Sequence, residues 1–285
     1  MPYHSPDTLQ EALKILEQDQ VTIIAGGTDY YPSRAGGGAS ASLLDVTRIP
    51  ELRGITKSGE GWRIGGAVTW TEIVNSLFPP AFDGLRSAAR EVGSVQIQNA
   101  GTVAGNICNA SPAADGVPPL LALEAEVETV SASGTRRMQL EEFVAGPRQT
   151  RLGAGEIVSA IHVPSASSGG HGAFLKLGSR RYLVISITMV AANVSLEEDG
   201  TIGSARIAVG ACSPVARRLP DLERASVGRD LSGLESAGWI EREFLSPLSP
   251  LDDVRGSAEY RILASVELCR RALEQAVNAG SGRAA

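Results

Sequence analysis

The pattern of apolar residues at the start of the chain predicts a helix followed by two strands. A helix over residues 8–17 begins at a capping box formed by Thr8 and Glu11. Its apolar face consists of Leu9, Ala12, Leu13 and Leu16. The apolar run 21–25 predicts a buried strand that ends in a tight turn, and residues 42–46 predict a second strand. Residues 1 to about 55 should therefore form a small α/β unit.

From about residue 56 the pattern predicts a larger unit built on strands. Residues 62–65, 127–130 and 155–163 read as strands, whereas 82–92 and 118–123 have helical spacing. The run 165–170 is rich in serine and glycine and predicts a linker. After it, β-rich runs at 183–196 and 201–211 flank Asp199-Gly200, which is a hairpin signal, and a last helix is expected over 258–276.

These elements predict an α+β fold with two domains. The first spans residues 1–165, with subdomains of about 1–55 and 56–165, and the second, smaller α+β domain spans 171–285. The chain length of 285 residues agrees with two domains at about 150 residues each.

Composition excludes several classes of partner. The net charge is -6 and charges of both signs are mixed along the chain, so we expect neither nucleic acid nor an anionic membrane surface as a partner. No apolar run approaches the roughly 18 residues of a membrane span, and the N-terminus lacks the features of a secretion signal. Cys108, Cys212 and Cys269 include no C-x-x-C pair. We therefore expect a cytoplasmic protein with no metal of its own.

The first segment that carries chemistry is A-G-G-T-D, residues 25–29, at the end of a predicted strand. Two glycines allow successive main-chain N–H groups to point into one concavity that can hold phosphate oxygens. A positive φ is expected at Gly26. Because the turn contains no lysine or arginine, an anion there would depend on main-chain donors. A plain turn between a strand and a loop is the alternative.

A second segment, residues 96–106, and a third, residues 109–115, are dense in small and hydrogen-bonding residues. Thr102, Asn106 and Asn109 supply donors, and small residues beside them allow a ligand to approach the backbone. Asp115 can accept hydrogen bonds from the paired hydroxyls of a ribose. A long, well-capped loop is the alternative for both segments.

Together these segments resemble a known family. The chain contains, in this order, A-G-G-T-D, Q-I-Q-N-A-G-T-V-A-G-N and S-P-A-A-D. These motifs are similar to those of the FAD-binding medium subunit of the xanthine dehydrogenase and carbon monoxide dehydrogenase family, the molybdenum hydroxylases. The stretch P-L-D-D-V-R-G-S-A-E-Y-R, residues 250–261, is similar to the closing domain of that family. The resemblance therefore covers essentially the whole chain.

The resemblance implies a two-subdomain FAD-binding domain of the vanillyl-alcohol oxidase type, with an extended FAD between the subdomains. It places these residues at the pyrophosphate: Ile24, Ala25, Gly26, Gly27, Thr28, Asp29, Thr102, Gly105 and Asn106. It places Asn109 and Asp115 at the pyrophosphate–ribose portion, and Val158 and Lys176 near the isoalloxazine.

The chain departs from the family pattern at Ala104, where glycine is common. No histidine lies between His4 and His162, so the FAD is expected to be non-covalent. The resemblance implies no catalytic residue in this chain and no metal ligand.

The resemblance also implies partner subunits. A large subunit would carry the molybdenum cofactor, molybdopterin, and a small subunit two [2Fe-2S] clusters. This sequence has neither a molybdenum-cofactor motif nor iron–sulfur cysteines. Electrons would pass from the clusters through FAD to NAD, oxygen or another acceptor, in a dimer of heterotrimers. The alternatives are a stand-alone flavin oxidase that recruits Tyr30, Tyr31 or Tyr182, and a flavin-free scaffold. A G-x-G-x-x-G motif and a P-loop are absent, so a nicotinamide-binding Rossmann domain and a P-loop NTPase are excluded.

Overall fold

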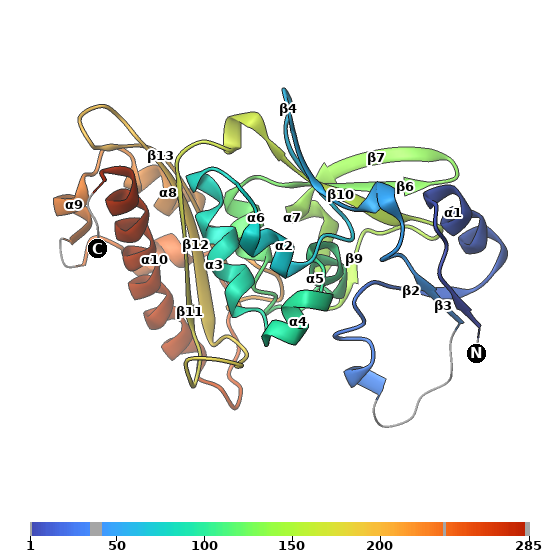
Figure 1. Ribbon diagram of the computed structural model, residues 1–285. Helices are drawn as coiled ribbons and strands as arrows, with labels where there is room; N and C mark the ends of the chain where they lie inside the picture. Colours follow the sequence, from blue (N-terminus) through green and yellow to red (C-terminus); the bar gives the residue numbers. More distant parts are fainter. Residues whose placement is uncertain (1, 35–41, 236–237, 283–285) are drawn as a thin grey trace.

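A computed structural model describes residues 2–34, 42–235 and 238–282 of the chain. The end of the second predicted domain, residues 283–285, lies outside the described residues. Figure 1 shows sheets with helices packed around them, running from the N-terminal unit on the right to the C-terminal helix on the left.

The N-terminal unit is a parallel sheet with one covering helix. Its strand order is β1-β3-β2, with β1 Tyr3–His4, β2 Val21–Ile24 and β3 Ser42–Asp45, and it carries helix α1 Leu9–Gln18. The Thr8 hydroxyl accepts a hydrogen bond from the Glu11 N–H at 3.2 Å and so caps α1. Two short 3-10 helices follow β2 and β3, at Pro32–Arg34 and Pro50–Leu52. The predicted helix and both strands are confirmed.

The second unit is an antiparallel sheet of five strands in the order β4-β5-β10-β6-β7. The strands are β4 Ile55–Ser58, β5 Gly61–Gly65, β6 Glu126–Ser131, β7 Gly134–Gln139 and the central β10 Ile157–Pro164. Its helices are α2 Trp70–Asn75, α3 Asp83–Glu91, α4 Val95–Ala100, α5 Val103–Asn109, α6 Val117–Ala122 and α7 Leu140–Phe143. A 3-10 turn Pro80–Phe82 and the small hairpin β8 Val144–Gly146 with β9 Gln149–Thr150 complete it. One apolar core, including Ile64, Leu85, Ile107 and Ile161, joins the sheet to the helices.

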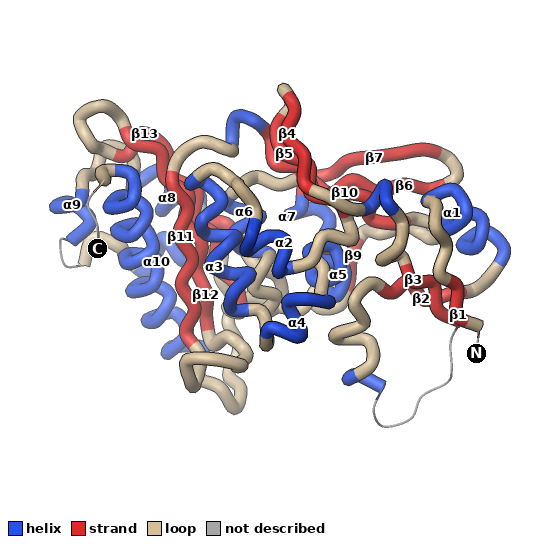
Figure 2. Tube along the Cα trace, viewed as in Figure 1, coloured by secondary structure: helices blue, strands red, loops and turns tan. Residues whose placement is uncertain are grey.

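The C-terminal sheet lies between two helical layers. Its antiparallel strands are β11 His171–Leu177, β12 Thr188–Leu196, β13 Ile202–Gly210 and β14 Arg217–Arg218. Helix α10 Ala258–Gly280 packs on β11 and β12, while α3 and α6 of the preceding unit contact the same sheet, on the other side in Figure 2. The remaining short helices are Ser165–Ser167, α8 Pro220–Ser226, α9 Leu231–Glu235 and Arg242–Leu245. The α+β fold class is confirmed.

The predicted hairpin at Asp199-Gly200 is confirmed, because β12 pairs with β13 and Gly200 has a φ of +84°. The predicted β-rich run 183–196 is wrong in its first part, since β12 begins only at Thr188. Leu183 and Ile185 are exposed, and Leu183 itself adopts a φ of +52°. The apolar pattern of this segment therefore belongs to a surface loop and not to a buried strand.

One carboxylate joins the middle of the chain to the C-terminal sheet. Glu124 follows α6, and its side chain pairs with Arg206 at 2.8 Å and with Arg218 at 3.0 Å. The Ser167 hydroxyl donates to the same carboxylate at 2.5 Å. Burial raises the pKa of Glu124, but the Ser167 hydrogen bond and the two arginines outweigh it, so the pKa lies below its usual value.

We predict that Glu124→Gln lowers the free energy of unfolding at neutral pH by about 1–2 kcal/mol, because two arginines lose their shared counter-charge. A carboxyl whose folded pKa is depressed contributes stability above its unfolded pKa, near 4.5, and loses that contribution as the pH falls. The difference between the variant and the wild type should therefore shrink below about pH 4.5. Urea unfolding at several pH values measures it.

Glu126→Gln is the matched control, because Glu126 accepts only an exposed hydrogen bond from Gln139. It should unfold like the wild type. A Glu124→Gln protein as stable as the wild type at pH 7 would show that the carboxylate does not join the two parts.

Candidate cofactor-binding site

The first two glycine-rich segments are in direct contact. A Cβ atom on Gly26 would overlap the main-chain carbonyl of Ala100 and would lie 2.9 Å from the N atom of Gly101. The Thr28 hydroxyl oxygen lies 3.3 Å from the place where Gly101 would carry a Cβ. Residues 25–29 and 96–106, distant in the sequence, therefore form one continuous surface.

The expected positive φ falls on Gly27 and not on Gly26. Gly27 has a φ of +67°, and the ring of Tyr31 lies over it, 2.6 Å from the position of an added Cβ. Gly26 is required for a different reason, which is the close approach of another main chain. The prediction of a positive φ at Gly26 is wrong, although a glycine is needed at both positions.

The turn after β2 presents unused main-chain donors. Within the part of the chain that the structure describes, the N–H groups of Gly26, Gly27 and Thr28 donate to no acceptor. A run of such N–H groups forms a concavity suited to an anion. This observation fits the phosphate oxygens of a dinucleotide.

The other predicted residues of this turn differ in exposure. Ile24 is the last residue of β2, and its side chain is buried. Ala25 is half-buried, whereas Asp29 is exposed. The surface of the turn is thus made by residues 25–29, while Ile24 anchors it.

The second segment is fixed by a cap and by the start of α2. The Thr102 hydroxyl accepts a hydrogen bond from the Gly105 N–H at 2.9 Å and caps α5. The main-chain N–H of Trp70 donates to the Gly101 carbonyl at 3.1 Å. The buried Trp70 ring packs against Gly101, with its Cδ1 atom 3.4 Å from the place where Gly101 would carry a Cβ. Ala104, the departure from the family pattern, is buried in the core, so its methyl group does not occupy the outer surface.

Asn106 contributes a buried acceptor. Its side-chain oxygen has no hydrogen-bond partner among the described residues. It lies 2.9 Å from the place where Gly116 would carry a Cβ, so this glycine leaves room for the amide. A buried acceptor without a donor is unusual in proteins, and this oxygen lies against Gly116 and not at the outer surface.

Asp115 and Lys176 form a buried ion pair. The Lys176 Nζ donates to Asp115 Oδ2 at 2.7 Å, and the Ser186 hydroxyl donates to Oδ1 at 3.0 Å. The side chains of Lys176 and Asp115 are 7% and 10% exposed. Burial raises the pKa of Asp115, and the charge and hydrogen bonds of Lys176 and Ser186 oppose that shift.

This pair bears on the two assignments that the resemblance implies. An extended FAD separates its adenosine ribose from its isoalloxazine by the whole pyrophosphate. Asp115 at the ribose and Lys176 at the isoalloxazine would then lie far apart, but the structure places them in contact. The two residues therefore lie in the same part of the structure.

Asn109 lies one helical turn after Asn106 on α5, and Val158 lies on β10. Asn109 is the last residue of α5, where the guanidinium of Arg148 donates to its side-chain oxygen. Val158 is 6% exposed and belongs to the core beneath the helices. The structure thus brings residues 25–29 against residues 100–101 and pairs Asp115 with Lys176. Val158 lies in the core.

Local sequence patterns gave no sign of several residues at the site. Trp70, Ser186 and Arg148 reach it only through the tertiary fold, from α2, the loop before β12 and the β8–β9 turn. Of the tyrosines considered for a stand-alone oxidase, Tyr31 covers Gly27, Tyr30 bonds to Arg34, and Tyr182 is exposed on a loop.

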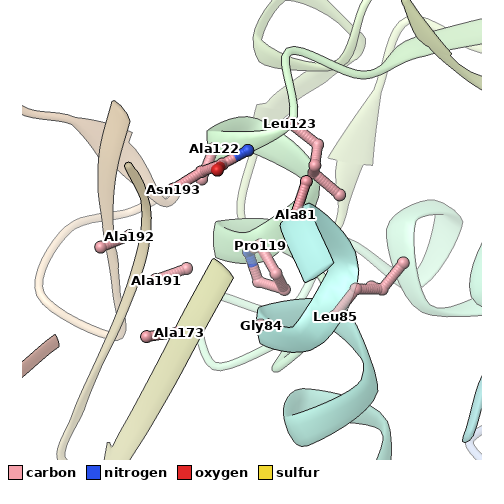
Figure 3. Close-up of a pocket in the computed structure, with 10 residues that line it drawn as sticks. All are labelled: Ala81, Gly84, Leu85, Pro119, Ala122, Leu123, Ala173, Ala191, Ala192 and Asn193. Atoms are coloured by element: carbon pink, nitrogen blue, oxygen red, sulfur yellow. The ribbon is translucent and has the colours of Figure 1, made fainter. Parts of the chain in front are cut away.

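A separate small pocket lies between α3 and α6 on one side and β11 and β12 on the other (Figure 3). It is lined by Ala81, Gly84, Leu85, Pro119, Ala122, Leu123, Ala173, Ala191, Ala192 and Asn193. Asn193 is its one side chain with hydrogen-bonding groups, and none of the predicted site residues lines it. This apolar pocket belongs to the packing between helices and sheet.

Two further observations concern metals and membranes. Across residues 2–34, 42–235 and 238–282, no three His, Cys, Asp or Glu side chains gather into a group that could hold a metal ion. No helix in the same ranges is long and apolar enough to cross a membrane.

Comparison with protein families identifies both parts of the chain. Residues 1–166 match the FAD binding domain in molybdopterin dehydrogenase, and residues 173–276 match the CO dehydrogenase flavoprotein C-terminal domain. The chain belongs to the FAD-binding medium subunits of the molybdenum hydroxylases. The family resemblance seen in the sequence is confirmed.

Individual family members are similar over nearly their full length. The chain is 33% identical to the nicotine 6-hydroxylase medium subunit of Paenarthrobacter nicotinovorans over 96% of each chain. It is 30% identical to the xanthine dehydrogenase FAD-binding subunit of Escherichia coli O157:H7, over 99% of this chain and 97% of the relative. A solved carbon monoxide dehydrogenase chain from Hydrogenophaga pseudoflava has a TM-score of 0.85 and 27% identity, covering 100% of this chain and 98% of that one.

We predict that Gly26→Ala weakens FAD binding by at least about tenfold, equal to roughly 1.4 kcal/mol. The added methyl group overlaps the Ala100 carbonyl and must push residues 25–29 away from residues 100–106. Flavin absorbance of the purified protein, followed by titration of the apo-protein with FAD, measures the effect.

Gly59→Ala is the matched control. It lies in the turn between β4 and β5, and an added Cβ there meets no atom within 4 Å. Its FAD affinity should equal that of the wild type. Unchanged affinity in Gly26→Ala would show that contact between the two segments is not needed for the cofactor.

Proposed function

We propose that this chain is the FAD-binding electron-transfer subunit of a molybdenum hydroxylase complex, passing electrons from [2Fe-2S] clusters of a partner subunit through FAD to an external acceptor. The observation that carries the proposal is the junction at Gly26, where unused N–H groups and a glycine-rich helix start form one surface. Family membership over the whole chain supports the same function.

We assign the pyrophosphate to this junction. Residues 26–28 supply unused main-chain donors from one segment, and Thr102, Gly105 and Asn106 belong to the other. No lysine or arginine lies in either segment, so main-chain dipoles offset the phosphate charge. Ile24, Ala25 and Asp29 shape the turn around these donors.

The remaining predicted residues extend the site beyond the junction. Asn109 is proposed to contact the pyrophosphate–ribose portion, and Val158 to support the flavin from the core. The Asp115–Lys176 pair offers a fixed donor next to a fixed acceptor in a site that is largely closed to water. When bound, FAD supplies the electron-accepting and electron-donating chemistry, and the chain holds and orients it.

We further propose a large molybdenum-cofactor subunit and a small [2Fe-2S] subunit as permanent partners, in a dimer of heterotrimers. The names of the relatives support this, since they are medium or FAD-binding subunits. Permanent interfaces often bury roughly 2,000 Å² or more.

The two family matches also support a division into domains of 1–165 and 171–285. The three unpaired cysteines favour a reducing compartment such as the cytoplasm.

The purified chain should carry FAD that heat or acid releases without covalent attachment. The reason is that no histidine lies in residues 5–161, which contain both glycine-rich segments. Absorbance of the supernatant after acid precipitation measures the released flavin. A folded, colourless protein that does not bind added FAD would contradict the proposed function.

The isolated chain should oxidise no purine, aldehyde or carbon monoxide at ordinary enzyme rates. In a complex co-expressed with both partner subunits, the organic substrate should bleach the flavin absorbance, whereas the same substrate should leave the flavin of the isolated chain oxidised. Anaerobic spectra of both preparations make the comparison. Substrate turnover by the isolated chain would instead favour a stand-alone oxidase.

A further inference from the structure

Ala110 and Arg148 are two of the non-glycine residues with a left-handed backbone conformation, and their main chains are hydrogen-bonded to each other. Ala110, which ends α5, has a φ of +47°, and Arg148, in the turn between β8 and β9, has a φ of +60°. The Arg148 N–H donates to the Ala110 carbonyl at 2.8 Å. Each such position costs on the order of 1 kcal/mol or more for a residue with a side chain. Glycine would occupy either position without that cost.

The side chain of Arg148 makes contacts that glycine could not make. Its guanidinium donates to the side-chain oxygen of Asn109, and also lies 3.4 Å from the main-chain oxygen of the same residue. Arginine has donors and no acceptor, so the Asn109 oxygen must face the guanidinium and the Asn109 NH₂ group must face away from it. Among the described residues this NH₂ group has no acceptor.

We propose that Arg148 is a positioning residue of the cofactor site, which fixes the Asn109 amide as a hydrogen-bond donor toward an oxygen of the FAD pyrophosphate–ribose portion. The inference rests on the proposed function. Without the guanidinium, the amide can rotate and present either its oxygen or its NH₂ group to the ligand. An oxygen facing a phosphate oxygen would repel it. The strained backbone at Arg148 is thus offset by contacts that orient a ligand-binding side chain.

The test uses Arg148→Gly, which keeps the left-handed turn and removes only the side chain. Titration of the full-length apo-protein with FAD should show affinity weaker by about tenfold, the loss of roughly one directed hydrogen bond. The thermal midpoint of the apo-protein should stay equal or rise, because glycine relieves the backbone strain. A residue with a structural role alone would lower the midpoint and leave the FAD affinity unchanged.

Two further variants separate an action through Asn109 from direct contact with the ligand. Asn109→Ala should weaken FAD binding to a similar extent, and adding Arg148→Gly to it should produce no further loss. Arg148→Lys retains one donor and should recover part of the affinity that Arg148→Gly loses. Arg151→Gln is the matched control, because it removes the same positive charge as Arg148→Gly. Among the described residues the Arg151 guanidinium donates only to the Glu142 carbonyl, so this variant should bind FAD as the wild type does.

Wild-type affinity in Arg148→Gly would overturn this inference alone and leave the proposed function intact. Fully additive losses in the double variant would also overturn it, because Arg148 would then act on the ligand directly. A wild-type chain that binds no FAD would overturn the proposed function and this inference together.

Discussion

The close approach of two main chains at Gly26 is the constraint on which the cofactor site depends. Any side chain at this position would collide with the Ala100 carbonyl, so the end of β2 and the end of α4 can meet only through a glycine. That contact sets the unused N–H groups of residues 26–28 beside the capped start of α5. Trp70 connects this junction to the core, because its side chain is buried and its main-chain N–H donates to the Gly101 carbonyl.

The second constraint is the ion pair between Asp115 and Lys176. Burying two charges is costly unless they are paired and hydrogen-bonded, and here Ser186 supplies the additional donor. Asp115 comes from the first family match and Lys176 from the second, so the pair fixes the C-terminal sheet against the site. Glu124 makes a comparable connection to Arg206 and Arg218 elsewhere on the same sheet. The site therefore depends on both parts of the chain.

The sequence was sufficient to predict the features that depend on interactions between neighbouring residues. The cap at Thr8, the strand before Gly26 and the hairpin at Gly200 all follow from neighbouring residues, and each is present in the structure. The predicted burial of that strand is wrong except at Ile24, because its other three residues are half-buried. The three motifs between residues 25 and 115 identified the family together with the stretch 250–261, which extends the resemblance to the second domain. The assignment of individual roles to the site residues stays a prediction.

Features that depend on tertiary contact could not be read from the sequence. The local sequence does not show which of Gly26 and Gly27 has the positive φ and which meets Ala100, and nothing near Asp115 in the sequence points to Lys176. The loop before β12 resembled a strand because Leu183 and Ile185 are apolar, although the fold exposes them. Long-range packing decides each of these cases.

Hydrogen–deuterium exchange of the main-chain amides, with and without FAD, tests the central claim most directly. The N–H groups of residues 26–28 have no acceptor within the described chain, so they should exchange rapidly in the apo-protein. Added FAD should slow their exchange together with that of residues 102–106. Unchanged exchange at residues 26–28, with protection appearing elsewhere in the chain, would contradict the assignment of the pyrophosphate to this junction.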